Sequence, residues 1–120
     1  MPAALGRLKK RSEFLAVAAA NRRSVTPGLM LQAKANPEGP NPEGAEPRLR
    51  LGFTATKKIG NAVKRNRARR RLRAAAADVL ANVAGNADLV LVARQDTIKR
   101  PFPELKRDLV SALGRLGILR

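Results

Sequence analysis

Basic side chains are concentrated in one segment of this 120-residue chain, residues 57–73. Guanidinium and ammonium groups at such density bind nucleic-acid phosphates, and Arg also stacks on bases. Asn66 lies inside the run, and its amide can both donate and accept hydrogen bonds. Nine of the 17 residues are basic and none is acidic: Lys57, Lys58, Lys64, Arg65, Arg67, Arg69, Arg70, Arg71 and Arg73. The segment therefore predicts a nucleic-acid contact.

The apolar residues of this region predict the helix that carries the charges, from about residue 61 to residue 84. Its expected buried side comprises Ala68, Leu72, Ala75, Ala76 and Val79. The arc opposite comprises Lys64, Arg67, Arg70 and Arg71, while Arg65 and Arg69 lie nearer the apolar flank. Like charges three or four residues apart oppose a helix by roughly 0.2–0.5 kcal/mol per pair. We therefore expect a bound polyanion to compensate them.

The composition of the whole chain also indicates a polyanionic partner. Lys plus Arg number 25 and Asp plus Glu number 9, so the net charge is +16. Nucleic acid is the first candidate and an anionic membrane surface the second. The chain has no His and no Cys, which excludes imidazole bases, thiolate metal ligands and disulfides. Because carboxylates are not clustered either, we expect no catalytic residue, no metal and no small-molecule ligand in the protein itself.

The length and the hydropathy pattern indicate one domain without a membrane span. No apolar run approaches the roughly 18 residues of a transmembrane helix. We expect neither such a helix nor a signal peptide, and a cytoplasmic location. Residues 1–120 are expected to form a single RNA-binding domain.

Periodicity predicts the elements that must position the basic segment. Ser12 followed by Glu13 indicates a hydroxyl cap and the start of a short amphipathic helix, residues 12–20. Alternation predicts strands at 29–35 and 49–55, paired antiparallel, and there is room for a short strand near 24–25. The apolar run 89–93 predicts a central strand buried on both faces. Leu105, Leu109, Leu113 and Leu116 form the stripe of a last helix. The order α-β-β-(β)-α-β-α predicts an α/β (α+β) two-layer sandwich with a mixed sheet and a βαβ crossover.

The segment 36–47 interrupts this pattern. It repeats Asn-Pro-Glu-Gly once and contains four prolines, which cannot donate strand hydrogen bonds. We expect a flexible hairpin loop between the two strands at 29–35 and 49–55. Its acids, Glu38, Glu43 and Glu46, are repelled by phosphate, so the loop is expected to point away from RNA.

The stretch 51–73 resembles the signature of the bacterial ribonuclease P protein family. It contains a Lys-Lys-hydrophobic-Gly turn, Lys57 to Gly60, and then Arg65-Asn66-Arg67 with further basic residues. Leu8 to Lys10, Glu13-Phe14 and Ala93-Arg94 extend the resemblance outward. It implies the family's α/β sandwich with a left-handed βαβ crossover. It also implies two RNA partners: the catalytic RNA subunit, and precursor tRNA, whose 5′ leader is removed by chemistry that depends on Mg²⁺ bound to RNA.

The resemblance also assigns residues to the two RNA partners. The residues implied for the RNA subunit are Lys57, Lys58, Asn61, Lys64, Arg65, Asn66, Arg67, Arg69, Arg70, Arg71 and Arg73. Those implied for a leader cleft between the sheet and the first helix are Arg11, Phe14, Phe53 and Arg94. The family usually has a second aromatic one turn after Phe14, where this chain has Ala18.

Other readings fit the same size and charge. A ribosomal protein or another RNA-binding assembly factor differs from the first reading only in the Arg-Asn-Arg context. A DNA-binding module lacks support, because no helix-turn-helix partner or dimerisation heptad accompanies the basic helix. A protein-only nuclease would need hydrolytic groups that the composition does not offer.

Overall fold

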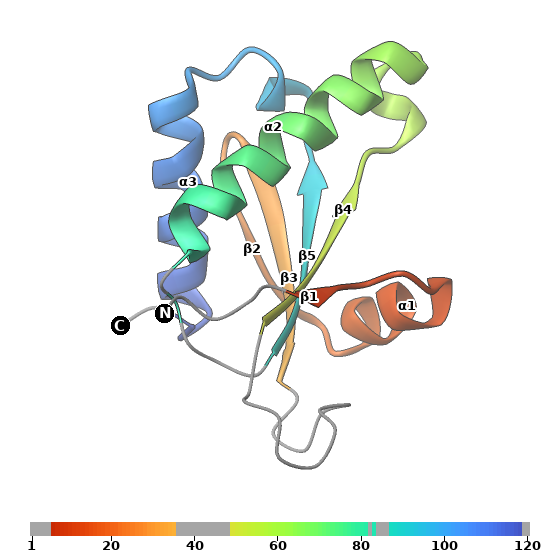
Figure 1. Ribbon diagram of the computed structural model, residues 1–120, viewed down its shortest axis with the longest axis vertical. Helices are drawn as coiled ribbons and strands as arrows, with labels where there is room; N and C mark the ends of the chain where they lie inside the picture. Colours follow the sequence, from red (N-terminus) through yellow and green to blue (C-terminus); the bar gives the residue numbers. More distant parts are fainter. Residues whose placement is uncertain (1–5, 36–48, 82, 84–86, 119–120) are drawn as a thin grey trace.

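The computed structural model describes residues 6–35, 49–81, 83 and 87–118. Figure 1 shows one sheet with helices on both sides. The strands are β1 (Gly6–Arg7), β2 (Arg22–Val25), β3 (Leu29–Ala35), β4 (Leu49–Thr54) and β5 (Ala87–Ala93). The helices are α1 (Arg11–Ala19), α2 (Ala62–Leu80) and α3 (Phe102–Arg115), with short 3-10 turns η1 (Lys57–Ile59) and η2 (Gln95–Thr97).

The sheet has the strand order β1-β4-β5-β3-β2. The apolar run became the central strand β5, as expected, and Leu89, Val90 and Leu91 are buried. β5 is parallel to β4 and antiparallel to β3. The predicted antiparallel pairing of 29–35 with 49–55 is therefore wrong, because β5 lies between these strands. Ala35 and Leu49 both face Ala87 across β5, so the 36–47 segment, which lies outside the described residues, does not connect a hairpin.

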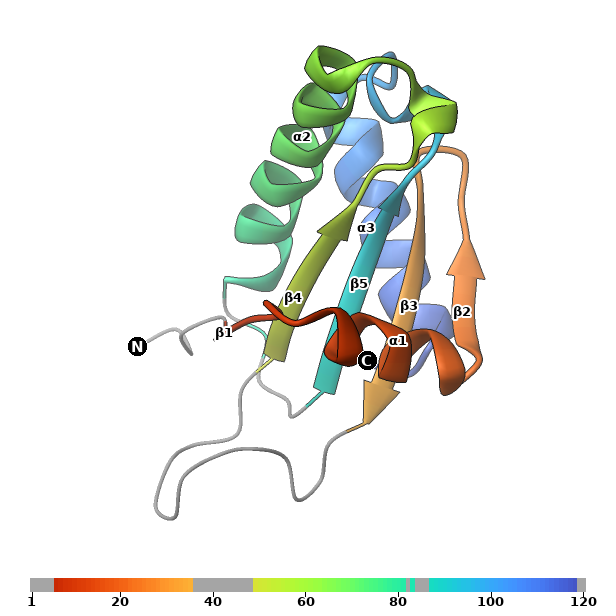
Figure 2. The same cartoon turned by 90° about the vertical axis from the view of Figure 1, so that its right-hand side faces the viewer.

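The connection β4–α2–β5 joins two parallel neighbours through a helix on one face. In Figure 2 both strands point upward, α2 runs behind the sheet, and β5 lies to the right of β4. This arrangement is a left-handed crossover, whereas about 98% of such connections are right-handed. The handedness agrees with the expectation drawn from the family resemblance, and it places α2 beside the β4 edge of the sheet.

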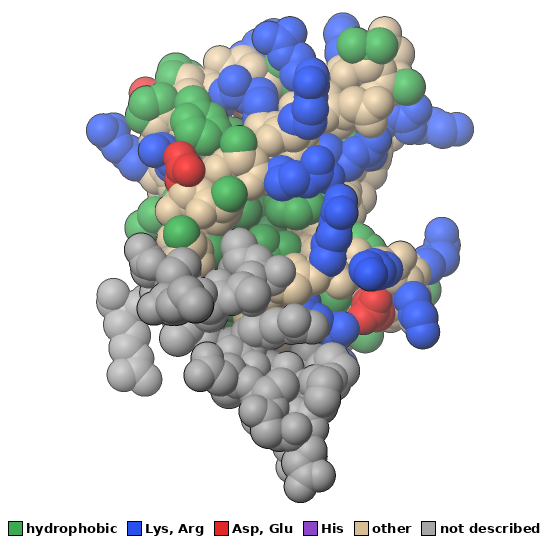
Figure 3. All heavy atoms as spheres, in the orientation of Figure 1, with side chains coloured by type: hydrophobic (Ala, Val, Ile, Leu, Met, Phe, Trp, Pro, Cys, Tyr) green, Lys and Arg blue, Asp and Glu red, His purple; other side chains and the backbone are tan. Residues whose placement is uncertain are grey.

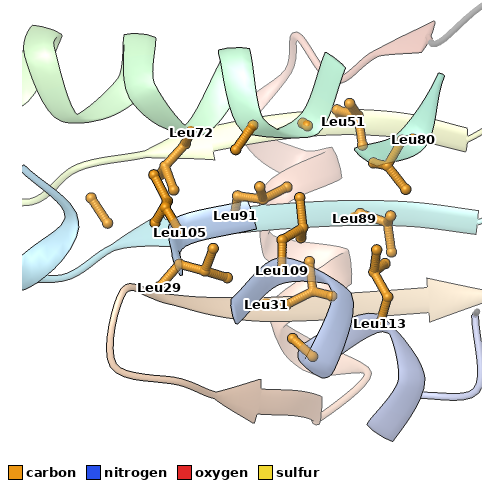
Figure 4. Packing of buried hydrophobic residues seen from close by; sticks show 14 of the residues in the cluster. Leu29, Leu31, Leu51, Leu72, Leu80, Leu89, Leu91, Leu105, Leu109 and Leu113 are labelled. Atoms are coloured by element: carbon orange, nitrogen blue, oxygen red, sulfur yellow. The ribbon is translucent and has the colours of Figure 1, made fainter. Parts of the chain in front are cut away.

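The main core lies between the sheet and the helices α2 and α3. Inward residues alternate along each strand, and Figure 4 shows Leu29, Leu31 and Leu91 meeting Leu105 and Leu109 of α3. The stripes predicted for both helices are buried, except that Val79 and Leu116 are only half-buried. The expected α/β sandwich with a mixed sheet is thus confirmed, and α1 adds a partial layer on the opposite face of the sheet through Val17 (Figure 2).

Two helix ends differ from the expectation. α1 begins at Arg11, so Ser12 is not its cap. Instead the Glu13 carboxylate accepts hydrogen bonds from the Lys9 and Lys10 backbone N–H groups, at 3.0 and 2.9 Å. An acid in the first turn can satisfy these groups as a hydroxyl would. α2 ends at Leu80 rather than near residue 84, and a turn follows in which the N–H of Val83 donates to the Leu80 carbonyl.

Candidate nucleic-acid interface

The exposed face of α2 carries a basic ridge, formed by Lys64, Arg67 and Arg70. All three side chains are exposed, while Ala68 and Leu72 on the other side of the helix are fully buried. The ion pairs formed within the described part of the chain use Arg50, Arg100 and Lys106 as the cations. The basic ridge thus keeps its charges for a partner, and Figure 3 shows Lys and Arg gathered over α2.

The start of α2 adds further cations to the basic ridge. Asn61 caps the helix, because its side-chain oxygen accepts the Lys64 backbone N–H at 3.0 Å. This contact gives Asn61 a structural role beside its predicted RNA contact. Gly60 just before it has φ +133°, a conformation that side chains rarely adopt. The turn brings Lys58 beside Arg67 and Lys99, around a groove of about 590 Å³.

The middle of the Arg-Asn-Arg stretch lies at the flank of α2. The Arg69 guanidinium donates to the Asn66 side-chain oxygen, so the Asn66 amino group points its donors elsewhere. Arg65 is half-buried, and its Nε is buried without a hydrogen-bond partner within the described structure. These positions agree with the flank that the helical periodicity predicted for Arg65 and Arg69.

Arg71 does not belong to the exposed arc, contrary to the expectation. It is half-buried, and its guanidinium donates to two backbone carbonyls, that of Thr97 at 2.9 Å and that of Arg100. Thr97 in turn donates its hydroxyl to the Gly28 carbonyl and accepts the Arg94 backbone N–H. Arg71 therefore ties α2 to the η2 turn rather than facing a partner.

The residues predicted for the leader cleft do not share one surface. Phe14 lies against Gly52 on the α1 face of the sheet, where a methyl group at Gly52 would meet the ring. Phe53, the next residue in β4, points to the opposite face and packs against the α2–α3 core. Arg73 of α2 covers its ring, with the guanidinium carbon 5.5 Å from the ring centroid. The grouping of Phe53 with Phe14 is therefore wrong.

The α1 face carries an open strip beyond the helix, formed by Val25, Met30, Thr54 and Val92. The β-sheet register places these residues side by side on four strands, and all four are partly or largely exposed. Arg94 follows β5 at one end of this face and donates to the Thr26 carbonyl at 2.6 Å. Counting along β5 from Val90, the partner of Gly52, Arg94 lies about 13 Å from the level of Phe14, at about 3.3 Å per residue.

A model of the family described as Ribonuclease P matches residues 3–117. The chain belongs to the ribonuclease P protein family. The ribonuclease P protein component of Paramagnetospirillum magneticum is 49% identical over 121 residues, 100% of this chain and 89% of that protein. That of Gluconacetobacter diazotrophicus is 47% identical over 113 residues, 93% and 91% of the two chains. The solved RNase P protein of Staphylococcus aureus has the same fold, with TM-score 0.71 at 21% identity over 95% and 97% of the chains.

Membership of the ribonuclease P protein family decides between the sequence hypotheses. The chain is a protein component of bacterial ribonuclease P, part of the holoenzyme that processes precursor tRNA. The ribosomal, DNA-binding and protein-only nuclease readings are set aside. Ribonuclease P is a ribonucleoprotein, so the polyanionic partner that the +16 net charge indicates is an RNA. Within the described ranges, no helix has the length and apolar character to cross a membrane.

Two acidic residues of this ribonuclease P protein, Glu13 and Asp88, hold β4 to α1 and to β5. Arg50 of β4 donates to Asp88 of β5 and to Glu13 of α1, at 2.7 and 2.6 Å. The hydrogen bonds from the Lys10 and Lys9 backbone, with help from Arg50, lower the pKa of Glu13 from 4.5 to about 2. Asp88 and Glu13 raise the pKa of Arg50. Among the residues described, no three His, Cys, Asp or Glu side chains gather as a metal site would require.

Sequence reasoning missed several residues that the fold brings to these surfaces. Arg7 and Lys99 lie outside the basic run 57–73, and the sheet and the η2 turn place them beside α2. Thr54 and Val92 belong to the open strip. In the sequence, the alternation of β4 and β5 indicates only that these two residues face away from the main core. A basic run is visible in a sequence, whereas cations contributed singly by distant segments are not.

Proposed function

We propose that the basic ridge of α2 binds the RNA subunit of ribonuclease P, while the α1 face binds the 5′ leader of precursor tRNA. The observation that supports the first part is the exposure of Lys64, Arg67 and Arg70 without acidic partners among the described residues. A row of like charges without opposite partners destabilises the helix by repulsion. Binding of a phosphate backbone would neutralise these charges and restore the stability of the helix.

The cations around the ridge extend its reach along the RNA backbone. Lys57 and Lys58 are exposed in η1, and Lys99 is exposed after η2. The groove between them also contains apolar Ile59, Val63 and Ile98, and Val63 is 75% exposed. Arg65, Asn66 and Arg69 complete the contact at the flank of α2, whereas Arg71 acts by positioning η2.

The leader of precursor tRNA would lie along the open strip. Phe14 offers a ring for stacking at the α1 end of this face, and Arg94 offers a guanidinium at the other end. Arg11 precedes Phe14 by one helical turn and is exposed. Aromatic stacking is tolerant of base identity, which suits a leader whose sequence varies from one tRNA to another.

The hydrolytic chemistry belongs to the RNA in this proposal, with Mg²⁺ held by RNA supplying it. The described carboxylates do not form a site for that ion. Glu13, Asp88, Glu104 and Asp108 already pair with Arg50 or Arg100, Asp78 pairs with Lys106, and Asp96 belongs to no group of three acidic side chains within the described residues. The protein would therefore position the substrate, in the cytoplasm where precursor tRNA is made.

The experiment that tests this proposal replaces the ridge and measures salt dependence. The variant Lys64→Ala, Arg67→Ala and Arg70→Ala is compared with the native chain for binding to the RNA subunit. Each lost phosphate contact lowers the slope of log K against log salt by about 0.7–0.9, so three should lower it by about 2–3. The matched control, Lys106→Ala, Arg107→Ala and Arg115→Ala on α3, removes the same charge away from the ridge.

Reconstituted cleavage of precursor tRNA provides the second readout. The ridge variant should need a higher protein concentration to reach the native rate, and the rate at saturation should return to that of the native holoenzyme. An unchanged slope for the ridge variant, or an equal loss in the α3 control, would show that α2 is only a solvated face.

A further inference from the structure

Phe53 and Arg73 form one wall of a groove at the β4 edge of the sheet. The edge groove is lined by Gly6, Arg7, Leu51, Phe53, Arg73 and Ala77, and has a volume of about 300 Å³. Arg7 stands there because β1 runs parallel to β4, with Arg7 opposite Leu51. The small residues Gly6 and Ala77 leave room between the strand and the helix.

Helix geometry brings Arg73 to this groove from the basic ridge. Residues three apart on an α-helix are offset by about 60° around the axis. The row Lys64, Arg67, Arg70 and Arg73 therefore winds from the exposed side of α2 toward the β4 edge. A polyanion that follows the ridge meets the edge groove at its end. In Figure 3, Lys and Arg border hydrophobic side chains just below α2.

The charge of the edge groove favours an anionic ligand with a flat ring. Among the described residues that line it, both charged ones are cations and none is a carboxylate. Phe53 is half-buried, so the phenyl ring supports the guanidinium from below while the groove remains open beside it. Guanidinium planes and aromatic rings are the two surfaces on which proteins stack unpaired RNA bases.

A second aromatic–cation pair in the same chain provides the contrast. Lys106 of α3 lies 5.3 Å from the centroid of Phe102. There the cation also meets an acid, since Lys106 Nζ is 3.5 Å from Asp78. The pocket beside them is lined by the acid Asp78 as well as by the cations Lys106 and Arg107. Phe102 and Phe53 thus share the ring–cation geometry and differ in the charge around it.

We propose that the edge groove binds one unpaired nucleotide of the ribonuclease P RNA subunit, with its base stacked on the Arg73–Phe53 pair and its phosphate on Arg7. The inference rests on the proposed function of the basic ridge and extends that contact by a base-stacking site on the opposite face of the sheet from Phe14. It gives Phe53 a role distinct from leader binding.

A tryptophan reporter tests the site directly, because the chain has no Trp and no Tyr. Phe53→Trp and the matched control Phe102→Trp are each titrated with the RNA subunit, and with precursor tRNA alone. Stacking of a base should quench the emission at position 53 at least twofold with the RNA subunit, and leave that at position 102 nearly unchanged. Quenching at position 53 by precursor tRNA alone would assign the groove to the substrate and overturn the proposal.

Two further variants separate stacking from charge. Arg73→Lys keeps the charge and removes the planar guanidinium, and Phe53→Leu keeps an apolar side chain without a ring. Each should weaken binding to the RNA subunit by about tenfold, which is within the range of one stacked base. Thermal unfolding verifies that both variants fold.

The outcomes distinguish this site from the ridge. The edge-groove proposal would be wrong if Arg73→Lys and Phe53→Leu bound the RNA subunit with native affinity. It would also be wrong if the tryptophan at position 53 stayed unquenched while the salt slope remained native. Neither result would contradict the proposal for the basic ridge. If the native chain did not bind the RNA subunit at all, both the ridge and the edge-groove proposals would be wrong.

Discussion

The ring of Phe14 in α1 lies so close to Gly52 in β4 that a methyl group at position 52 would be 2.5 Å from its Cε1 atom. Real Cβ contacts do not occur at that distance. Leu8 stands 3.2 Å from the same point, so the site is enclosed from a second side. The absence of a side chain at Gly52 thus allows the first helix to rest its aromatic ring on the sheet.

Gly52→Ala is therefore expected to push Phe14 off β4. Overpacking of this kind costs about 1–3 kcal/mol of unfolding free energy, measurable by urea denaturation. Because the ring moves, precursor tRNA should lose affinity relative to mature tRNA. In the double variant with Phe14→Leu, the stability cost should be smaller than the sum of the two single costs. Full additivity would mean that the two residues do not act through this contact.

Neighbouring arginines of α2 are expected to have opposite phenotypes. Arg71→Ala removes two hydrogen bonds to carbonyls near the buried Thr97, and should cost about 1–3 kcal/mol of stability. Its slope of RNA binding against salt should stay native. Arg70→Ala should leave stability nearly unchanged and lower the slope by about 0.7–0.9. Denaturation and salt titration of the pair check this, and similar effects of both changes would contradict the assignment.

Acid is expected to loosen α1 in a defined pH window. The folded-state pKa of Glu13 is depressed from 4.5 to about 2, so its carboxylate stabilises the fold fully above about pH 4.5. That contribution is lost as the pH falls from about 4.5 toward about 2. Glu13→Gln should destabilise the chain by about 1 kcal/mol at pH 7, as for other lost caps. The gap between the native and Gln chains should narrow in acid, and a gap constant down to pH 2 would refute this role.

The 36–47 segment is expected to tolerate shortening only to the length that crosses β5. Ala35 and Leu49 both face Ala87, so they are two strand spacings apart, about 10 Å. A flexible six-residue link should preserve the fold within about 1 kcal/mol, and cleavage by the holoenzyme within about twofold if the segment avoids RNA. A two-residue Asn-Gly turn should disrupt the sheet. Thermal unfolding and precursor cleavage test both shortened chains, and a large loss of cleavage with the fold intact would show that the segment contacts RNA.

The sequence predicts which face of a strand each side chain lies on better than it predicts which strands and helices lie next to one another. Alternation placed Leu49, Leu51 and Phe53 on one side of a strand, and the structure agrees. It could not show that α1 packs on the other side, so Phe53 was grouped with Phe14. Strand pairing was likewise inferred from order along the chain, and β5, encoded later, came between β3 and β4.

The position of Arg71 shows the same limit within one helix. Periodicity put Arg70 and Arg71 in one exposed arc, and it holds for Arg70. The η2 turn that covers Arg71 comes from residues 95–97, and nothing in the helix sequence indicates where that turn lies. The basic character of the segment was thus readable from composition, whereas the division between exposed and half-buried arginines required the tertiary structure.

The last strand along the chain, β5, is the one that joins the sheet together. In the described part of the chain, β1 pairs with β4 and β2 pairs with β3, so the two halves of the sheet meet there through residues 87–93. The cationic α2 leaves the ribosome before the strand that completes the surface beneath it. A chain that ends before β5 therefore lacks the strand that joins β4 to β3, and the surface on which α2 packs is complete only when residues 87–93 are present.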